Sequence, residues 1–255
     1  MADWSRFAVS GILVLIRVSG LMLFAPFFSS AAIPRMVKAV FTVVLAGLLT
    51  PIAANHPGAA PALGLMSMLG ELSTGLLFGL SLTLLMEMLS FSGQILGLQF
   101  SFSLVNVLDP NSPIETPLLS QLLNTVGLLV LLATGLDRTL VSALMHTFAA
   151  VPVGTAWMAT RTSLALVEMT SGVFLAAVQL SAPVMAATLL VEVVVALIGR
   201  LSPQLPVLFV GIPLKTLIGY TVLIGSLGVW PRFIEARFDG LLNQAVGLVL
   251  ASHRV

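Results

Sequence analysis

Long apolar stretches dominate the chain, and the polar positions between them mark where each stretch ends. A helix that crosses the hydrocarbon core of a bilayer needs about 20 mostly apolar residues. By this criterion the sequence predicts six helical segments. They cover residues 7–28, 36–52, 63–108, 117–136, 169–191 and 201–230.

The third segment, Leu63 to Leu108, is too long for one ordinary crossing. At 1.5 Å per residue it would be roughly twice as long as the hydrocarbon core is thick. It must therefore bend, turn back or extend beyond the bilayer. The residues 109–113, DPNSP, end it, because two prolines in a polar cluster break any helix.

The chain contains no linker and no repeat of fixed period, so we expect a single helical membrane domain over residues 1–255. Its fold class is all-α and polytopic, with about six long helices, some of them interrupted by proline and glycine. Residues 232–255 form a short amphipathic C-terminal tail. The N-terminus is predicted to be a retained helix rather than a cleaved signal, because Arg17 interrupts the apolar stretch and no small-residue cleavage site follows it.

Composition supports a membrane environment and excludes several classes of function. Hydrophobic residues make up 58% of the chain and charged residues only 8%, against about 25% charged residues in soluble domains. The net charge of +1 creates no basic field for nucleic acid. Without cysteine the chain has no disulfides or thiolate sites.

No motif in the sequence is typical of an enzyme. The chain has no phosphate-binding loop, no nucleophile elbow, no HExxH zinc motif and no dinucleotide fingerprint. The three histidines are too dispersed to suggest a metal site. We therefore expect no catalytic residues, no metal and no cofactor.

Ionisable groups inside apolar helices are costly and often functional. The candidates are Arg17, Glu71, Glu87, Glu168, Glu192 and Lys215. They could form a proton or ion relay. Alternatively, they pair with one another, with backbone groups or with a partner subunit, or reach toward the interface. Their spacing shows no repeated array, which favours the second interpretation.

Small residues recur at a spacing of four. Gly75 and Gly79 share a face with Glu71, and Gly93 and Gly97 repeat the spacing. Such glycines allow close backbone approach between membrane helices. They indicate either a tight packing seam between subunits or packing within the chain, and the spacing does not separate the two.

Residues 99–117, QFSFSLVNVLDPNSPIETP, form the most unusual polar stretch. Non-helical backbone beside membrane spans is tolerated only where protein or a water-filled cavity covers it. This stretch could be a loop that reaches into a pore or an ordinary exposed connection. Composition alone favours the connection.

Several strings, taken in order, resemble one family. They are residues 17–28, RVSGLMLFAPFF, followed by Ile33-Pro34; Gly70-Glu71; Gly93-Gln94-Ile95; Gln99 to Ser103; Asp109-Pro110; and residues 200–215, RLSPQLPVLFVGIPLK. This order resembles the FliR family of flagellar biosynthesis, which is shared with the equivalent export-apparatus subunit of virulence type III secretion systems. Two positions depart from the family's pattern, Ser101 in place of glycine and Pro206 in place of asparagine.

The resemblance implies a bacterial inner-membrane subunit of the flagellar basal body that assembles with FliP and FliQ and engages FlhB. Members of that complex surround a closed conduit for unfolded export substrates, and their helices form kinked hairpins. It also implies a plug, for which Phe100, Phe102, Asn106, Leu108, Asp109 and Pro110 are the candidate residues. Gly75, Gly79, Gly93 and Gly97 would pack subunits together, and Arg17, Glu71 and Lys215 would be buried polar anchors.

Two other functions are weighed against this one. A self-sufficient secondary transporter or channel would place buried carboxylates at a midplane site between broken helices, but the sequence shows no internal two-fold repeat. An intramembrane enzyme would require clustered His, Asp or Ser partners, which the sequence does not offer. Substrate flux through the purified chain alone would favour the transporter.

Overall fold

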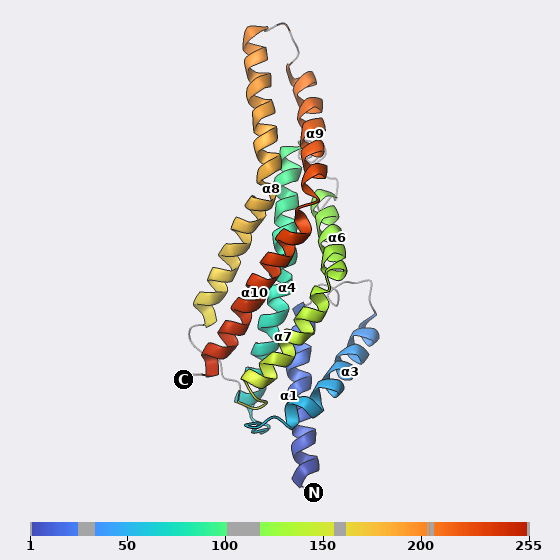
Figure 1. Ribbon diagram of the computed structural model, residues 1–255, viewed down its shortest axis with the longest axis vertical. Helices are drawn as coiled ribbons and strands as arrows, with labels where there is room; N and C mark the ends of the chain where they lie inside the picture. The colour runs from blue at the N-terminus through green and yellow to red at the C-terminus, as the bar shows by residue number, and fades with distance from the viewer. Residues whose placement is uncertain are drawn as a thin grey trace. The chain divides into compact units, whose positions relative to one another are not determined.

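The computed structural model describes residues 2–24, 34–100, 118–155, 162–202, 204 and 207–253. Within these ranges every regular element is an α-helix, which confirms the all-α prediction (Figure 1). The helices are α1 (Ala2–Phe24), α3 (Arg35–Ala54), α4 (Leu65–Gln99), α6 (Leu118–Ala133), α7 (Leu136–Ala150), α8 (Thr162–Leu201), α9 (Val207–Ser226) and α10 (Trp230–His253).

The helices have the length and composition of membrane spans. In the described residues, five stretches are long and apolar enough to cross a bilayer: Trp4–Phe24, Arg35–Ala54, Leu65–Gln99, Met169–Leu201 and Phe209–Ser226. A sixth results if Leu118–Ala133 and Arg138–Ala149 together count as one broken span. The prediction of about six membrane helices is therefore confirmed.

Helix α4 accounts for the third apolar segment. It is one α-helix of 35 residues and does not turn back. At 1.5 Å per residue its length is about 52 Å, against about 30 Å for the hydrocarbon core of a bilayer. Of the three alternatives that the sequence left open, turning back within these residues is excluded.

Three helical boundaries differ from the sequence-based prediction. Helix α7 lies between the predicted segments 117–136 and 169–191, where no helix was predicted, and Gly135, in the left-handed conformation with φ 72°, separates it from α6. Helix α8 has 40 residues and continues through Pro183 and past both ends of the predicted span. The tail is a helix, α10, of 24 residues. The prediction ended helical segments at charged residues, but the main-chain hydrogen bonds of the helices continue through these residues.

The chain forms two compact units, the first of Met1–Leu85, Gly135–Ser171 and Arg237–Val255, and the second of Met86–Thr134 and Gly172–Ala236. Helices α4, α8 and α10 each contribute residues to both. In the first unit α1 and α3 form an antiparallel hairpin, with Gly11 against Thr50, and Leu13, Val14 and Val18 are fully buried.

In the second unit, α4 and α8 run parallel and in a fixed register. Ser92 and Ser181 share a hydrogen bond of 2.7 Å, and Thr188 donates one of 3.2 Å to Gln99. Both pairs are 89 positions apart. Leu89, Leu96, Leu123 and Leu131 fill the unit's core with no exposed surface.

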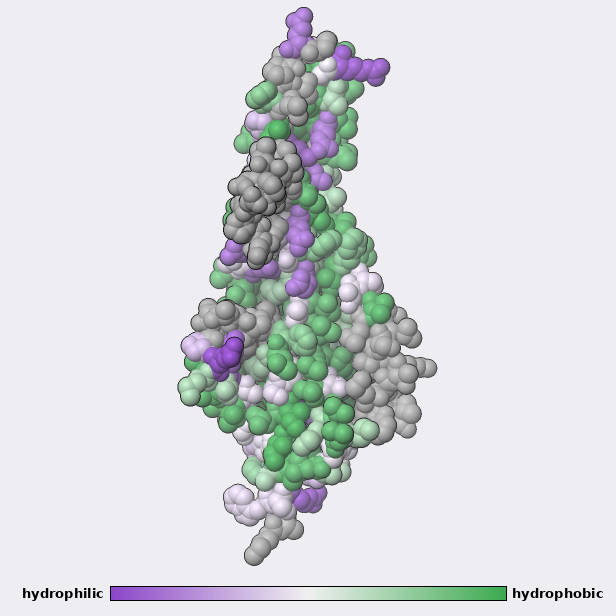
Figure 2. Space-filling model, turned by 180° about the vertical axis from the view of Figure 1, so that it is seen from behind, coloured by the Kyte–Doolittle hydropathy of each residue, from purple (hydrophilic) through white to green (hydrophobic). Residues whose placement is uncertain are grey.

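Large apolar side chains cover much of the outer surface. Only 11% of the 18-residue span in α9 and 17% of an 18-residue apolar stretch of α8 are buried within the chain. Phe209, Leu201 and Met36 are each 82% exposed, and hydrophobic residues run along much of the face shown in Figure 2. Such continuous apolar surface is stable only against lipid or partner protein.

Candidate functional site

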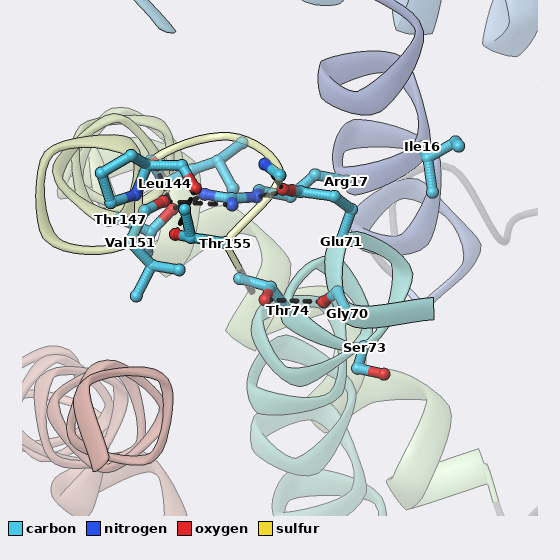
Figure 3. A network of polar contacts seen from close by, with 12 residues as sticks. Ile16, Arg17, Gly70, Glu71, Ser73, Thr74, Leu144, Thr147, Val151 and Thr155 are labelled. Carbon is cyan, nitrogen blue, oxygen red and sulfur yellow. Dashed lines mark hydrogen bonds and ion pairs between the residues drawn. The ribbon is translucent and has the colours of Figure 1, made fainter. Parts of the chain in front are cut away.

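A fully buried ion pair joins α1 to α4 in the first unit. Arg17 Nε donates to Glu71 Oε2 at 2.5 Å, and both side chains have no exposed surface. Figure 3 shows the Arg17 side chain extending from α1 to Glu71 and on toward Thr147 and Val151. The lone positive charge of the first apolar stretch is thereby neutralised.

Both terminal nitrogens of the Arg17 guanidinium also donate hydrogen bonds. Arg17 Nη1 donates to Thr147 Oγ1 at 3.2 Å, and Nη2 donates to the Val151 carbonyl at 3.3 Å. The guanidinium lies 4.2 Å from the centre of the Phe148 ring, in a cation–π arrangement. These contacts tie α1 to the C-terminal end of α7.

The other oxygen of Glu71 accepts a hydrogen bond from a turn. The backbone N–H of Gly154 donates to Glu71 Oε1 at 2.9 Å. Gly154 has φ 86°, and a Cβ there would lie 2.3 Å from the carbonyl oxygen of Ala60. Only glycine fits both the conformation and the close approach. The network therefore connects α1, α4, α7 and two loops.

Gly75 and Gly79 lie on the same face of α4 as Glu71, one and two turns along, and this face is covered by α1. A Cβ at Gly75 would lie 1.9 Å from the Arg17 carbonyl oxygen, and one at Gly79 would lie 2.6 Å from that of Leu21. On α1, Gly20 plays the same part: a Cβ there would lie 2.8 Å from the Leu72 carbonyl oxygen of α4. These glycines pack two helices of one chain; a role between subunits stays a prediction.

Gly93 holds α6 close to α4 in the second unit. A Cβ at Gly93 would lie 2.4 Å from Cα of Ser120, whose hydroxyl donates to the Ser90 carbonyl at 2.8 Å. Gly97, one turn further along α4, is buried. As with Gly75, the contact of Gly93 is intramolecular.

Phe100 is the one candidate plug residue that the structure describes. It follows the last residue of α4, is 3% exposed, and stacks on Tyr220 of α9 with ring centroids 4.7 Å apart and an interplanar angle of 17°. Its ring also fills the space over Gly219, where a Cβ would lie 2.1 Å from it. Phe102, Asn106, Leu108, Asp109 and Pro110 lie outside the described residues, as do Ser101 and Pro206.

Lys215, the third predicted anchor, forms an ion pair with Glu192 between α9 and α8. The Lys215 side chain is 14% exposed and that of Glu192 is 56% exposed, so this pair is far less enclosed than Arg17 and Glu71. Glu87 is exposed, and the side chain of Glu168 lies outside the description. Four of the six ionisable candidates thus pair with one another.

The sequence identified Arg17 and Glu71 but not their partners. Thr147 and Phe148 lie in α7, a helix that was not predicted, and Gly154 contributes a backbone group that carries no side-chain signal. No group of three or more possible metal ligands occurs in the parts of the chain described here. What the arrangement provides is rigid coupling between helices.

Comparison with known proteins adds an independent line of argument. The model of the family "Bacterial export proteins, family 1" matches residues 8–241. The chain is 25% identical over 236 residues to the flagellar biosynthetic protein FliR of Escherichia coli K12, covering 92% of this chain and 90% of that protein. It is 28% identical over 226 residues to the FliR protein of Bacillus subtilis 168, covering 86% of each.

A third relative, the flagellar biosynthetic protein FliR of Buchnera aphidicola from Acyrthosiphon pisum, is 27% identical over 229 residues, or 89% of each chain. The family match begins within α1 and ends in the middle of α10. Because the family model spans nearly the whole helical array that holds the ion pair and the glycine contacts, the chain belongs to family 1 of the bacterial export proteins.

Proposed function

We propose that the chain is a structural and gating subunit of the flagellar type III protein export gate in the bacterial inner membrane. The observation that carries this proposal is the family match over residues 8–241, together with relatives named flagellar biosynthetic protein FliR. The spans of α8 and α9 support it, because most of their residues are not buried within the chain and so provide surface for lipid or other subunits.

In this function the chain works without catalysis. It supplies wall and packing surface for a conduit that unfolded export substrates pass through, while other subunits provide energy. FliP-like, FliQ-like and FlhB-like subunits are the proposed partners. Exposed apolar side chains of α8 and α9, including Leu190, Leu197 and Phe209, are the candidate contact surface for them.

The segment between α4 and α6, including Phe102, Asn106, Leu108, Asp109 and Pro110, is proposed to plug the conduit. The described residues on both sides of it support this role. Phe100 is held by stacking on Tyr220, and Ser120 is held against Gly93. Gly93 and Phe100 are seven positions apart, or about 10 Å along a helix, so the described residues on either side of the segment lie near one place on α4.

Deletion of residues 106–112 tests the plug directly. The assembled complex should form with normal stoichiometry but conduct small ions, because the obstruction is removed while the anchors at Phe100 and Ser120 remain. Conductance of the purified complex in planar bilayers measures the effect. Replacing the same residues with an equally long Gly/Ser linker separates the loss of side chains from the shortening of the segment.

Unchanged conductance in a complex of normal composition would show that the plug assignment is wrong. A separate experiment, with the purified chain alone in liposomes, tests the transporter alternative. If the purified chain alone moved small solutes across liposomes, a self-sufficient transporter would replace the export-gate proposal.

Tyr220→Ala tests whether the anchor of Phe100 keeps the conduit closed. Loss of the ring stacking should cost about 1 kcal/mol, which corresponds to roughly a fivefold larger open fraction. Tyr220→Phe keeps the ring and serves as the matched control, with conductance expected at the level of the unmodified complex. Equal conductance in both variants would show that the stacking of Phe100 on Tyr220 does not keep the conduit closed.

A further inference from the structure

A pocket opens at one end of the α1–α3 hairpin, in the first unit. It has a volume of about 470 Å³, and its walls include Trp4, Arg6, Phe7, Ser10 and Asn55. The apolar span of α1 begins at Trp4 and that of α3 ends at Ala54, next to the polar loop that starts at Asn55. The pocket therefore lies where the apolar spans give way to polar residues, the level of lipid headgroups in a bilayer.

An unpartnered hydroxyl forms part of the pocket wall. Ser10 is 1% exposed, and its Oγ has no hydrogen-bond partner. Every other buried serine and threonine in the described residues is hydrogen-bonded; Thr50, for example, donates to the Ala46 carbonyl at 2.7 Å. A buried hydroxyl without a partner is destabilising, so a ligand that accepts a hydrogen bond from it would be favoured at this position.

The charges at the pocket favour an anion. Arg6 is exposed, and within the described residues its one hydrogen bond is long, 3.5 Å from Nη2 to the Ala59 carbonyl. Four residues in the first turns of α1 line the pocket, and the N-terminus of this helix of 23 residues carries partial positive charge. Backbone N–H groups and a guanidinium at one place are a typical phosphate-binding combination.

The apolar walls indicate that the anion is part of a lipid. Trp4 is 80% exposed and Phe7 is 42% exposed, and both contribute to the pocket. Tryptophan is enriched at the membrane–water interface, where its ring lies at the level of headgroups and the first acyl carbons. A free phosphate would leave these rings without a partner, whereas an acyl chain would cover them.

We propose that this pocket binds the phosphate-bearing headgroup of a membrane phospholipid. The Arg6 guanidinium and the Ser10 hydroxyl donate to the phosphate oxygens, and Trp4 and Phe7 pack against the glycerol and the upper part of an acyl chain. The site is separate from the proposed plug, and its occupancy does not depend on the export function. Its walls come from α1, the last residue of α3 and the loop that follows α3.

Lipid binding to the purified full-length chain tests the proposal. Phosphatidylglycerol is added to the chain in detergent, and bound lipid is counted by native mass spectrometry. Diacylglycerol with the same acyl chains lacks the phosphate, and glycerol 3-phosphate lacks the chains. Phosphatidylglycerol should bind more tightly than both.

Two variants locate the site within the chain. Arg6→Gln should weaken phosphatidylglycerol binding about tenfold, and Ser10→Ala about threefold to fivefold. Ser10→Ala should not lower the thermal stability of the lipid-free chain, because the hydroxyl has no partner to lose. Arg35→Gln removes the same charge at the other end of the hairpin and should leave binding unchanged.

Three results would overturn the proposal. Diacylglycerol could bind as tightly as phosphatidylglycerol, which would exclude recognition of the phosphate. Glycerol 3-phosphate could bind as tightly as the lipid, which would make the free anion the ligand. Arg6→Gln and Arg35→Gln could have equal effects, which would make the interaction a general effect of charge.

Discussion

Arg17→Met is expected to lower the free energy of unfolding by about 3–5 kcal/mol, the usual effect of removing one partner from a buried ion pair. The variant leaves the Glu71 carboxylate without a counter-charge in a site from which solvent is excluded. It also removes the hydrogen bonds to Thr147 and Val151. Thermal denaturation of the purified chain in detergent, followed by circular dichroism, measures the loss.

The double variant Arg17→Met/Glu71→Met distinguishes the ion pair from simple damage to packing. Removing both charges should restore part of the stability, because no uncompensated charge remains. Arg138→Met makes the same change at an exposed position in the same unit and should have little effect. A double variant as unstable as the sum of the two single variants would show that the two residues act independently.

Gly75→Ala is expected to have the second largest effect. The added methyl group would lie 1.9 Å from the carbonyl oxygen of Arg17 and 2.9 Å from its carbonyl carbon. Because both atoms belong to the backbone, no side-chain rotation relieves the clash, and α1 must move away from α4. Overpacking of this kind costs about 1–3 kcal/mol or more, and the displacement also disturbs the Arg17 side chain.

Gly47→Ala is the matched control for this prediction. Nothing lies within 4 Å of a Cβ at Gly47, which is exposed in the interior of α3. There alanine should stabilise the helix by up to about 1 kcal/mol, since it has the higher helix propensity. Parallel denaturation curves of the two variants should therefore move in opposite directions, and a shift in the same direction would contradict the close-approach explanation.

The existence of the helices could be predicted from the sequence because apolar runs of about 20 residues have few alternatives. Helix α3, predicted over residues 36–52, is found at Arg35–Ala54. Helix α7 was missed because Asp137, Arg138 and His146 interrupt its apolar pattern, although they do not interrupt its hydrogen bonding. Hydropathy indicates whether a segment lies in apolar or polar surroundings. It indicates a helix end only where the apolar run and the helix end at the same residue.

The sequence predicted which residues form buried polar contacts, but not which residues contact one another. A lone arginine and a glutamate within apolar helices indicated buried polar contacts, yet their sequence separation of 54 residues gives no sign that they meet. The glycine spacing indicated close helix approach but did not say which helix approaches. Both questions depend on tertiary packing, which a local pattern does not encode.

The two hydrogen-bonded pairs between α4 and α8 limit how the second unit can rearrange. Ser92–Ser181 and Gln99–Thr188 have the same offset, so sliding α8 by one residue, about 1.5 Å, would break both bonds at once. The hydroxyls of Ser181 and Thr188 would then keep only their bonds to backbone carbonyls of α8, those of Ala177 and Val184 among them. A rearrangement that keeps both bonds must therefore move the second-unit parts of α4 and α8 together, with the hinge placed elsewhere.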